Sequence, residues 1–79
     1  MSESISFDVE VDASGLTCPL PILRTKKALA KLQSGQVVKV TTTDLHAKDD
    51  FHAFAKQTGN TLLAQQVSDN ALIHYLQRR

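Results

Sequence analysis

Tryptophan is absent from this chain, cysteine and tyrosine occur once each, and there are only two prolines and three glycines among 79 residues. A single cysteine excludes an internal disulfide, and therefore excludes the disulfide-stapled class of small secreted domains. Neither charge sign dominates, because nine Lys and Arg stand against eight Asp and Glu. No overall positive field therefore draws the protein to nucleic acid, and any basic attraction must be local.

Long apolar runs and targeting segments are also missing. No apolar stretch approaches the about 20 residues that a membrane-spanning helix needs, so we expect no membrane partner. Residues 1–4 contain neither a basic region nor an apolar run, so we expect no secretory signal. Together with the free thiol, these absences favour the cytoplasm.

What the chain does contain suffices for one hydrophobic core. Apolar residues make up 42% and charged residues 22% of the chain, which is typical of globular and not of disordered sequences. A chain this short cannot fill a second core. We therefore expect one domain spanning residues 1–79, acting as a monomer.

The order of periodic segments predicts the fold. Strand-like alternation or β-branched composition marks four segments, and helical spacing of apolar residues marks two others. The strands are predicted at 5–12, 36–43, 61–67 and 71–76, and the helices at 19–33 and 47–58. This βαβαββ order favours an α+β fold, a two-layer α/β sandwich. Its four-stranded mixed sheet would begin with two parallel strands, close with a hairpin and carry both helices on one face.

The same patterns place individual side chains. Apolar periodicity puts three phenylalanines in the core, and parity with its apolar neighbours in the last strand makes His74 a packed or edge histidine. The three are Phe7, Phe51 and Phe54. We expect Gly35 and Gly59 to end the two helices in left-handed caps, and residues 77–79 to fray.

The rarest residues gather where the first strand passes into the first helix. Gly15 allows the chain to turn, and Pro19 and Pro21 suit a first helical turn, whose N–H groups have no partner in the helix. We expect the N–H groups of residues 20 and 22 to stay free and the positive helix end to lower the pKa of the Cys18 thiol. The segment thus predicts an exposed, activated nucleophile.

The alternative is a purely structural role for Cys18, because free cysteine is often a small buried hydrophobic residue. Residues that would assist the thiol are also scarce. His46, His52 and His74 show no spacing that demands a Cys–His pair, and no second cysteine could resolve a disulfide. No cluster of soft ligands suggests a metal site. A lone thiol without its own acid or base suits a carrier whose partners supply the chemistry.

The pattern Asp12-x-x-Gly15-x-x-Cys18-Pro19-x-Pro21 resembles the signature of the TusA/SirA-like family of small sulfur-carrier proteins. The family's length, element order and two-layer sandwich match the predictions above over almost the whole chain. Two departures are the pair Asp44-Leu45, where many relatives have Asp-Pro, and Ala55, where relatives often have cysteine.

The resemblance implies a function. Cys18 would accept sulfur as a persulfide from a cysteine desulfurase and relay it to an acceptor protein, most familiarly toward 2-thiouridine at the tRNA wobble position. The protein would then meet tRNA only indirectly, need no cofactor beyond the transient persulfide and be a sulfurtransferase-type carrier more than a stand-alone enzyme. Sulfur delivery to molybdenum cofactor or to sulfur-compound metabolism, a non-catalytic interaction or regulatory module, and a redox sensor are the alternatives.

Residues around Cys18 provide candidate contacts for such partners. Arg24, Lys27 and Lys31 form one stripe on the first predicted helix, which is either a solvated face or a docking stripe for an acidic partner. Leu16 and Leu20 either form an apolar collar that a partner covers or pack locally. Asp44, which follows the second predicted strand, is both a candidate helix cap and a candidate partner contact.

Overall fold

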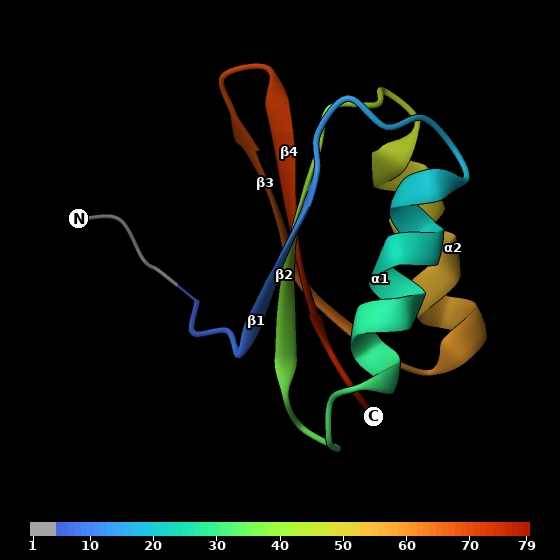
Figure 1. Cartoon of the computed structure of the whole chain (residues 1–79), viewed down its shortest axis with the longest axis vertical. Coiled ribbons are helices and arrows are strands. Elements are labelled where there is room, and N and C mark those ends of the chain that lie inside the picture. Colours follow the sequence, from blue (N-terminus) through green and yellow to red (C-terminus); the bar gives the residue numbers. More distant parts are fainter. Residues whose placement is uncertain (1–4) are drawn as a thin grey trace.

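Residues 5–79 are described by a computed structural model (Figure 1), so the segment 1–4, on which the expectation of no secretory signal was based, lies outside the described part. The elements follow in the predicted order βαβαββ. They are β1 (Val9–Ala13), α1 (Leu20–Ala30), β2 (Val37–Thr42), α2 (Ala47–Thr58), β3 (Thr61–Ser68) and β4 (Ala71–Gln77). Within residues 5–79, neither helix is long and apolar enough to cross a bilayer.

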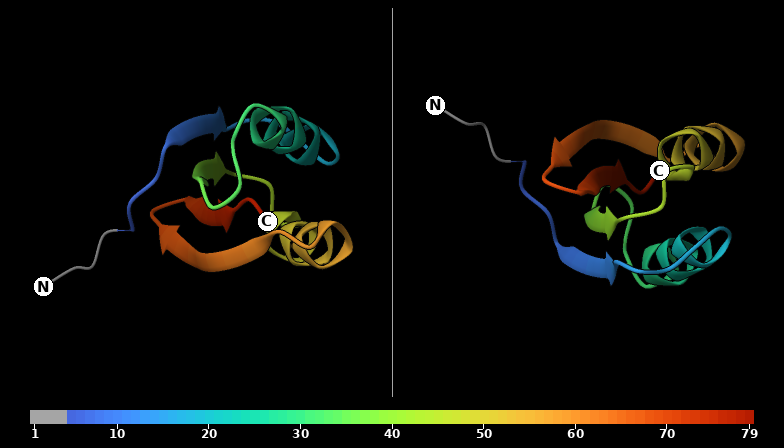
Figure 2. Two further views of the ribbon diagram at one scale, coloured as in Figure 1. Left: turned by 90° about the horizontal axis from the view of Figure 1, so that it is seen from below. Right: turned by 90° about the horizontal axis from the view of Figure 1, so that it is seen from above.

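The four strands form one mixed sheet in the order β1-β2-β4-β3. β1 and β2 are parallel, with Val9 opposite Val38 and Ala13 opposite Thr42, whereas β4 pairs antiparallel with both β2 and β3. Both helices lie on one face of the sheet, as the end-on views of Figure 2 show. The predicted two-layer α+β sandwich is therefore confirmed.

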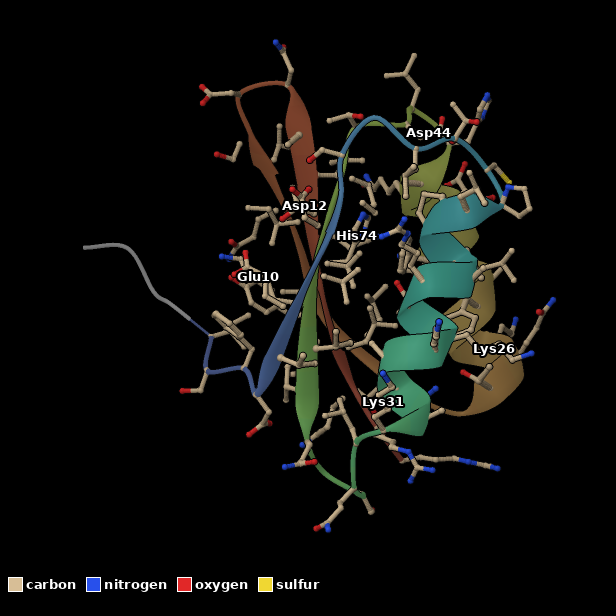
Figure 3. The ribbon with its side chains drawn as sticks, viewed as in Figure 1. Glu10, Asp12, Lys26, Lys31, Asp44 and His74 are labelled. Atoms are coloured by element: carbon tan, nitrogen blue, oxygen red, sulfur yellow. The ribbon has the colours of Figure 1, made fainter. Side chains whose placement is uncertain are left out.

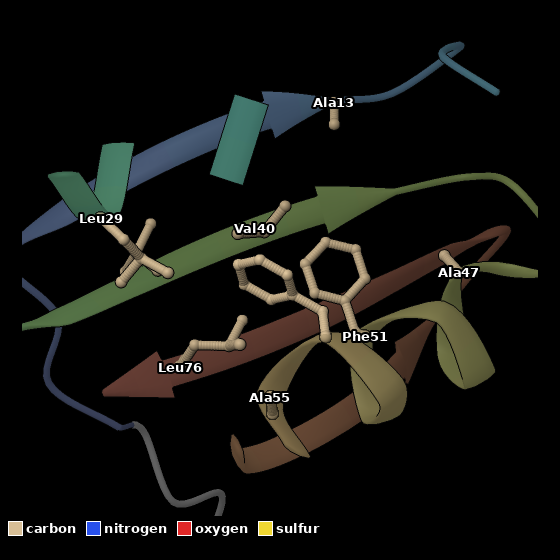
Figure 4. Packing of buried hydrophobic residues seen from close by; sticks show 9 residues of the cluster. Ala13, Leu29, Val40, Ala47, Phe51, Ala55 and Leu76 are labelled. Atoms are coloured by element: carbon tan, nitrogen blue, oxygen red, sulfur yellow. The ribbon is translucent and has the colours of Figure 1, made fainter. Parts of the chain in front are cut away.

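The core lies between the sheet and the helices (Figure 4). Successive side chains of a strand point to opposite faces, so alternate residues of β2 and β4 enter this layer while their neighbours face away. Phe51 and Phe54 of α2 pack edge-to-face with ring centroids 6.4 Å apart, which confirms their predicted place. The buried cluster comprises Ala13, Leu29, Val38, Val40, Ala47, Phe51, Phe54, Ala55 and Leu76.

His74 of β4 lies in this core and has no exposed surface, as Figure 3 shows between the sheet and the helices. Its ring stacks on Phe51 with centroids 4.2 Å apart. Nε2 lies 2.8 Å from the hydroxyl of Thr42, and Nδ1 lies 3.0 Å from the side-chain amide of Gln65. Burial lowers the pKa of His74 to about 4. The prediction of a packed histidine is confirmed.

The start of the first strand and the position of Phe7 were predicted wrongly. β1 begins at Val9, because the chain bends at Asp8, whose N–H and carboxylate both bond the backbone of Val37. Phe7 therefore lies on the sheet face away from the helices, 42% exposed. Its ring is 6.5 Å from that of Tyr75 and 5.2 Å from Nζ of Lys39.

Of the two predicted helix caps, the one at Gly59 is confirmed and the one at Gly35 is wrong. Gly59 ends α2 in the left-handed conformation with φ +80°, and its N–H donates to the carbonyl of Ala55, as predicted. α1, however, ends at Ala30, and its cap residue Lys31 has a right-handed conformation. The N–H groups of Lys31 and Leu32 donate to carbonyls three residues back, which narrows the last turn. Gly35 does have a positive φ of +90°, but it belongs to the turn before β2.

The prediction that residues 77–79 fray is wrong. Gln77 is part of β4, and the N–H of Arg78 donates to the carbonyl of Gln36 over 2.8 Å. The side chain of Arg78 donates to the carbonyl of Leu29, and the N–H of Arg79 donates to Asn60. These bonds join the chain end to three other parts of the fold.

Candidate functional site

Two loops meet at one end of the molecule. Parallel strands β1 and β2 end there, and both helices begin there (Figure 1). The loop between β1 and α1 contains Cys18, and the loop between β2 and α2 contains Asp44. The crevice beyond the carboxyl ends of parallel strands is where ligand sites in α/β proteins commonly lie. Sequence motif and topology thus point to the same end.

The first loop is held by bonds to its own backbone and to the second loop. The carboxylate of Asp12 accepts a hydrogen bond of 3.0 Å from the N–H of Ser14, and the side-chain and backbone bonds with Ser14 lower the pKa of Asp12. Gly15 takes a φ of +78°, where a side chain would be strained, and its N–H donates to the hydroxyl of Thr43 over 2.8 Å. Asp12 and Gly15 therefore shape the approach to Cys18.

Cys18 is exposed, so it is not the buried hydrophobe of the competing interpretation. Its N–H donates to the Asp44 carboxylate over 2.8 Å. The Cys18–Pro19 peptide bond is cis, and Pro19 precedes the first residue of α1. The N–H of Leu20 was predicted to be free, but it donates to the carbonyl of Thr17.

Asp44 connects the two loops. One carboxylate oxygen accepts from the N–H of His46 and the other from that of Cys18, at 3.1 and 2.8 Å. These bonds, with that of His46 the larger influence, hold the pKa of Asp44 below its ordinary value. The residue before α2 makes no side-chain cap, so the carboxylate orders the turn ahead of the helix. Its second predicted role, as a partner contact, stays a prediction.

The electrostatics of Cys18 are opposite to those expected. Hydrogen bonding to the Asp50 carboxylate, followed by partial desolvation and the charges of Asp50 and Asp44, raises the pKa of the Cys18 thiol. The predicted lowering of this pKa is therefore wrong in direction, because the hydrogen bond to Asp50 and the partial loss of hydration both favour the neutral thiol. At neutral pH the free protein therefore keeps its thiol mostly protonated.

The residues predicted as partner contacts divide into buried and exposed ones. Leu16 is half-buried against the core, so it packs locally, whereas Leu20 is 46% exposed. The three cations of the predicted stripe are exposed and line a groove of about 600 Å³ together with Leu20, Leu23 and part of β1. They are Arg24, Lys27 and Lys31.

Other candidate residues are not brought to the thiol. His74 is part of the core, and within residues 5–79 no three His, Cys, Asp or Glu side chains are grouped to hold a metal. Sequence reasoning missed Asp50 as a neighbour of the thiol and Thr43 as the anchor of the first loop. A parallel βαβ arrangement places both helix starts at the same sheet end, which is the signal that could have found Asp50.

Comparisons with known proteins agree with this fold. A family model described as Sulfurtransferase TusA matches residues 9–78, which include every helix and strand of the structure. The sulfur carrier protein TusA of Allochromatium vinosum is 54% identical over 70 residues, or 89% of this chain and 91% of that protein. A putative sulfur carrier protein of Neisseria meningitidis is 48% identical over 69 residues, or 87% and 93%. A crystal structure of a SirA-like protein from Desulfitobacterium hafniense superimposes with a TM-score of 0.80 and 28% identity, covering 89% of this chain and 96% of that one.

Proposed function

Since this chain belongs to the TusA family of sulfur-carrier proteins, we propose that it carries sulfur as a persulfide on Cys18. The observation that supports this most is an exposed thiol whose backbone is tied to Asp44 at the meeting point of two loops. The described residues contain no second thiol that could turn Cys18 into half of a redox pair. Loading and discharge are therefore tasks for partner proteins.

The proposed loading step is an exchange without net oxidation. The Cys18 thiolate attacks the outer sulfur of a persulfide on a cysteine desulfurase, and the sulfur–sulfur bond of that persulfide breaks. A new sulfur–sulfur bond forms on Cys18, the desulfurase cysteine leaves as a thiolate, and it takes up the proton that Cys18 lost. In discharge, an acceptor cysteine thiolate attacks the outer sulfur of the Cys18 persulfide, and Cys18 leaves as a thiolate. No cofactor beyond the transient persulfide is therefore needed.

The carboxylates beside Cys18 make loading dependent on the partner. Asp50 and Asp44 raise the thiol pKa in the free protein. Because the thiolate is the nucleophilic form, a raised pKa limits reaction of the exposed Cys18 with other electrophiles. A cation that a docked donor places against these carboxylates would lower that pKa again. Exposed apolar side chains nearby, Leu20 and the 91% exposed Leu45, would be covered in the same complex.

For the destination, we propose an acceptor on the route to 2-thiouridine in tRNA, the route for which the family is best known. tRNA itself would be met only through that acceptor, in keeping with the near-balanced charge of the chain. Delivery to molybdenum cofactor or to sulfur-compound metabolism uses the same loaded Cys18 and differs only in the acceptor.

The proposal is tested by intact mass spectrometry after incubation with a cysteine desulfurase and cysteine. We expect a gain of one sulfur atom that a reductant removes and that the Cys18→Ser variant lacks. A folded protein that gains no sulfur from any desulfurase tried would instead support a non-catalytic interaction module. Loaded protein that transfers no sulfur to a tRNA-thiolation acceptor would keep the carrier function and remove only the tRNA destination.

A further inference from the structure

Within residues 5–79, β1 is an edge strand whose outer side is unpaired, because β2 alone lies beside it in the sheet. Val37 of β2 directs its N–H and C=O toward Asp8, whereas Gln36 directs its carbonyl toward Arg78, so alternation along β2 turns Lys39 and Thr41 toward β1. These two lie opposite Glu10 and Asp12, and in a parallel pair only one of two opposite residues directs its backbone groups to the other strand. Glu10 and Asp12 therefore direct their N–H and C=O groups to the free edge, where they can receive another strand.

The two edges of this sheet are not alike. The other edge strand, β3, has a register shift between Leu62 and Ala64, and such irregularities twist an edge away from further pairing. β1 keeps an unbroken register from Val9 to Ala13. It is thus the edge of this sheet that offers regular pairing.

A groove of about 600 Å³ runs along this free edge, with α1 as its other wall. Figure 2 shows α1 beside β1 at the outer margin of the molecule. On α1 the lining residues occupy one face at helical spacing, apolar at the Cys18 end and cationic farther along. They are Leu20, Leu23, Arg24, Lys27 and Lys31. A helix beside an unpaired strand edge is a common arrangement for binding an extended peptide.

We propose that β1 and α1 together bind an extended segment of a partner protein, which adds to the sheet beside β1. The bound segment would have alternating side chains. Those on the helix side would be apolar near Leu20 and Leu23 and acidic near Lys27 and Lys31. Those on the opposite side would be basic, because Glu10 and Asp12 lie on that face (Figure 3). Glu10 already has Lys39 of β2 at 3.8 Å, and a basic residue of the added strand would take the equivalent place on its other side.

Charge also argues against other occupants. A second copy pairing antiparallel through β1, centred on Val11, would place Glu10 opposite Asp12, and like charges directly opposite one another are destabilising. Nucleic acid would meet the cations of α1 but also the carboxylates of Glu10 and Asp12, which repel its phosphates. An alternating peptide satisfies both walls.

This inference goes beyond sulfur transfer, because peptide binding is independent of the thiol. The groove nevertheless begins at Leu20, two residues after Cys18. A segment bound there would hold the rest of its protein next to the thiol. Cys18→Ser should therefore abolish persulfide formation and leave peptide binding unchanged, so that failure of either proposal is recognised separately.

The test uses a fluorescein-labelled peptide of about seven residues in which Lys alternates with Leu and Glu, a length that spans β1 with short overhangs. Two further peptides carry N-methyl groups on alternate amides, one set in each. Binding is measured by fluorescence anisotropy at low salt. We expect one methylated peptide to bind like the parent and the other about 30-fold more weakly, since it loses about two hydrogen bonds to the edge. Amide exchange at Glu10 and Asp12 should slow on binding.

Matched protein variants test the helix wall. Lys27→Glu combined with Lys31→Glu should weaken binding about tenfold, whereas Lys26→Glu should not, because Lys26 lies on the side of α1 away from the sheet (Figure 3). Circular dichroism checks that each variant is folded. Any of these results would overturn the proposal: no binding of the parent peptide, equal binding of both methylated peptides, dimerisation through β1, or displacement of the peptide by single-stranded RNA of equal length.

Discussion

Acidification should destabilise this protein through one buried side chain, His74. Its neighbours in the fold, the Thr42 hydroxyl, the Gln65 amide and the ring of Phe51, are uncharged and offer nothing to balance an imidazolium. In the unfolded chain the ring takes up a proton near its ordinary pKa of 6.5, but in the fold only near about 4. Between these values the unfolded state binds more protons, so stability falls as pH falls.

The size of the effect follows from the two pKa values. One proton taken up on unfolding changes the free energy of unfolding by about 1.4 kcal/mol per pH unit. For a ring that stayed fully shielded, lowering the pH from 7 to 5 would cost about 2 kcal/mol. Partial access of water to the charged ring reduces this, so we expect a loss of about 1–2 kcal/mol. Asp12 and Asp44 have lowered pKa values, so their contribution to stability is lost only as the pH falls below the ordinary value of 3.8, outside the range from pH 7 to 5.

Urea denaturation followed by circular dichroism at several pH values measures this loss. A domain of this size has a denaturant slope near about 1 kcal/mol per molar urea, so the midpoint should fall by about 1–2 M between pH 7 and 5. The control is His74→Gln, which cannot titrate and should lose most of the pH dependence, whatever its stability at pH 7. A wild-type midpoint unchanged over this range, or an equal fall in the variant, would refute the reasoning.

Two substitutions test the thiol environment and the helix end. Asp50→Asn removes the largest cause of the raised pKa of Cys18, so the midpoint of the pH–rate profile for iodoacetamide alkylation should move to lower pH. Asp49→Asn, which alters an exposed neighbour in the same turn, should leave it in place; equal profiles for all three proteins would contradict the assignment. Gly59→Ala should lower the free energy of unfolding by about 1–2 kcal/mol, because φ is +80° and the new Cβ would lie 3.1 Å from the Arg79 side chain. Gly15→Ala has a similar φ but open space around it, so a cost as large as that at Gly59 would show that the Arg79 contact is irrelevant.

Local patterns carried most of the fold prediction. Helical spacing identified both helices and the core positions of Phe51 and Phe54, and alternation placed His74 on the inner face of β4. The errors lie where long-range contacts override the pattern. Phe7 continues the apolar alternation of β1, but the bonds from Asp8 to Val37 bend the chain before it and turn its ring to the open face.

The sequence by itself determined that this chain has one cysteine, that proline stiffens the helix start beside it, and that a strand–helix–strand unit precedes a second helix and a hairpin. Those facts sufficed for the family and the fold, because periodicity and motif spacing are local properties. Only the tertiary structure decided the state of the thiol. Asp44 and Asp50 lie far from Cys18 along the chain and reach it because parallel pairing of β1 and β2 places both helix starts at one end. The hydrogen bond to Asp50, partial desolvation and the charges of both carboxylates raise its pKa.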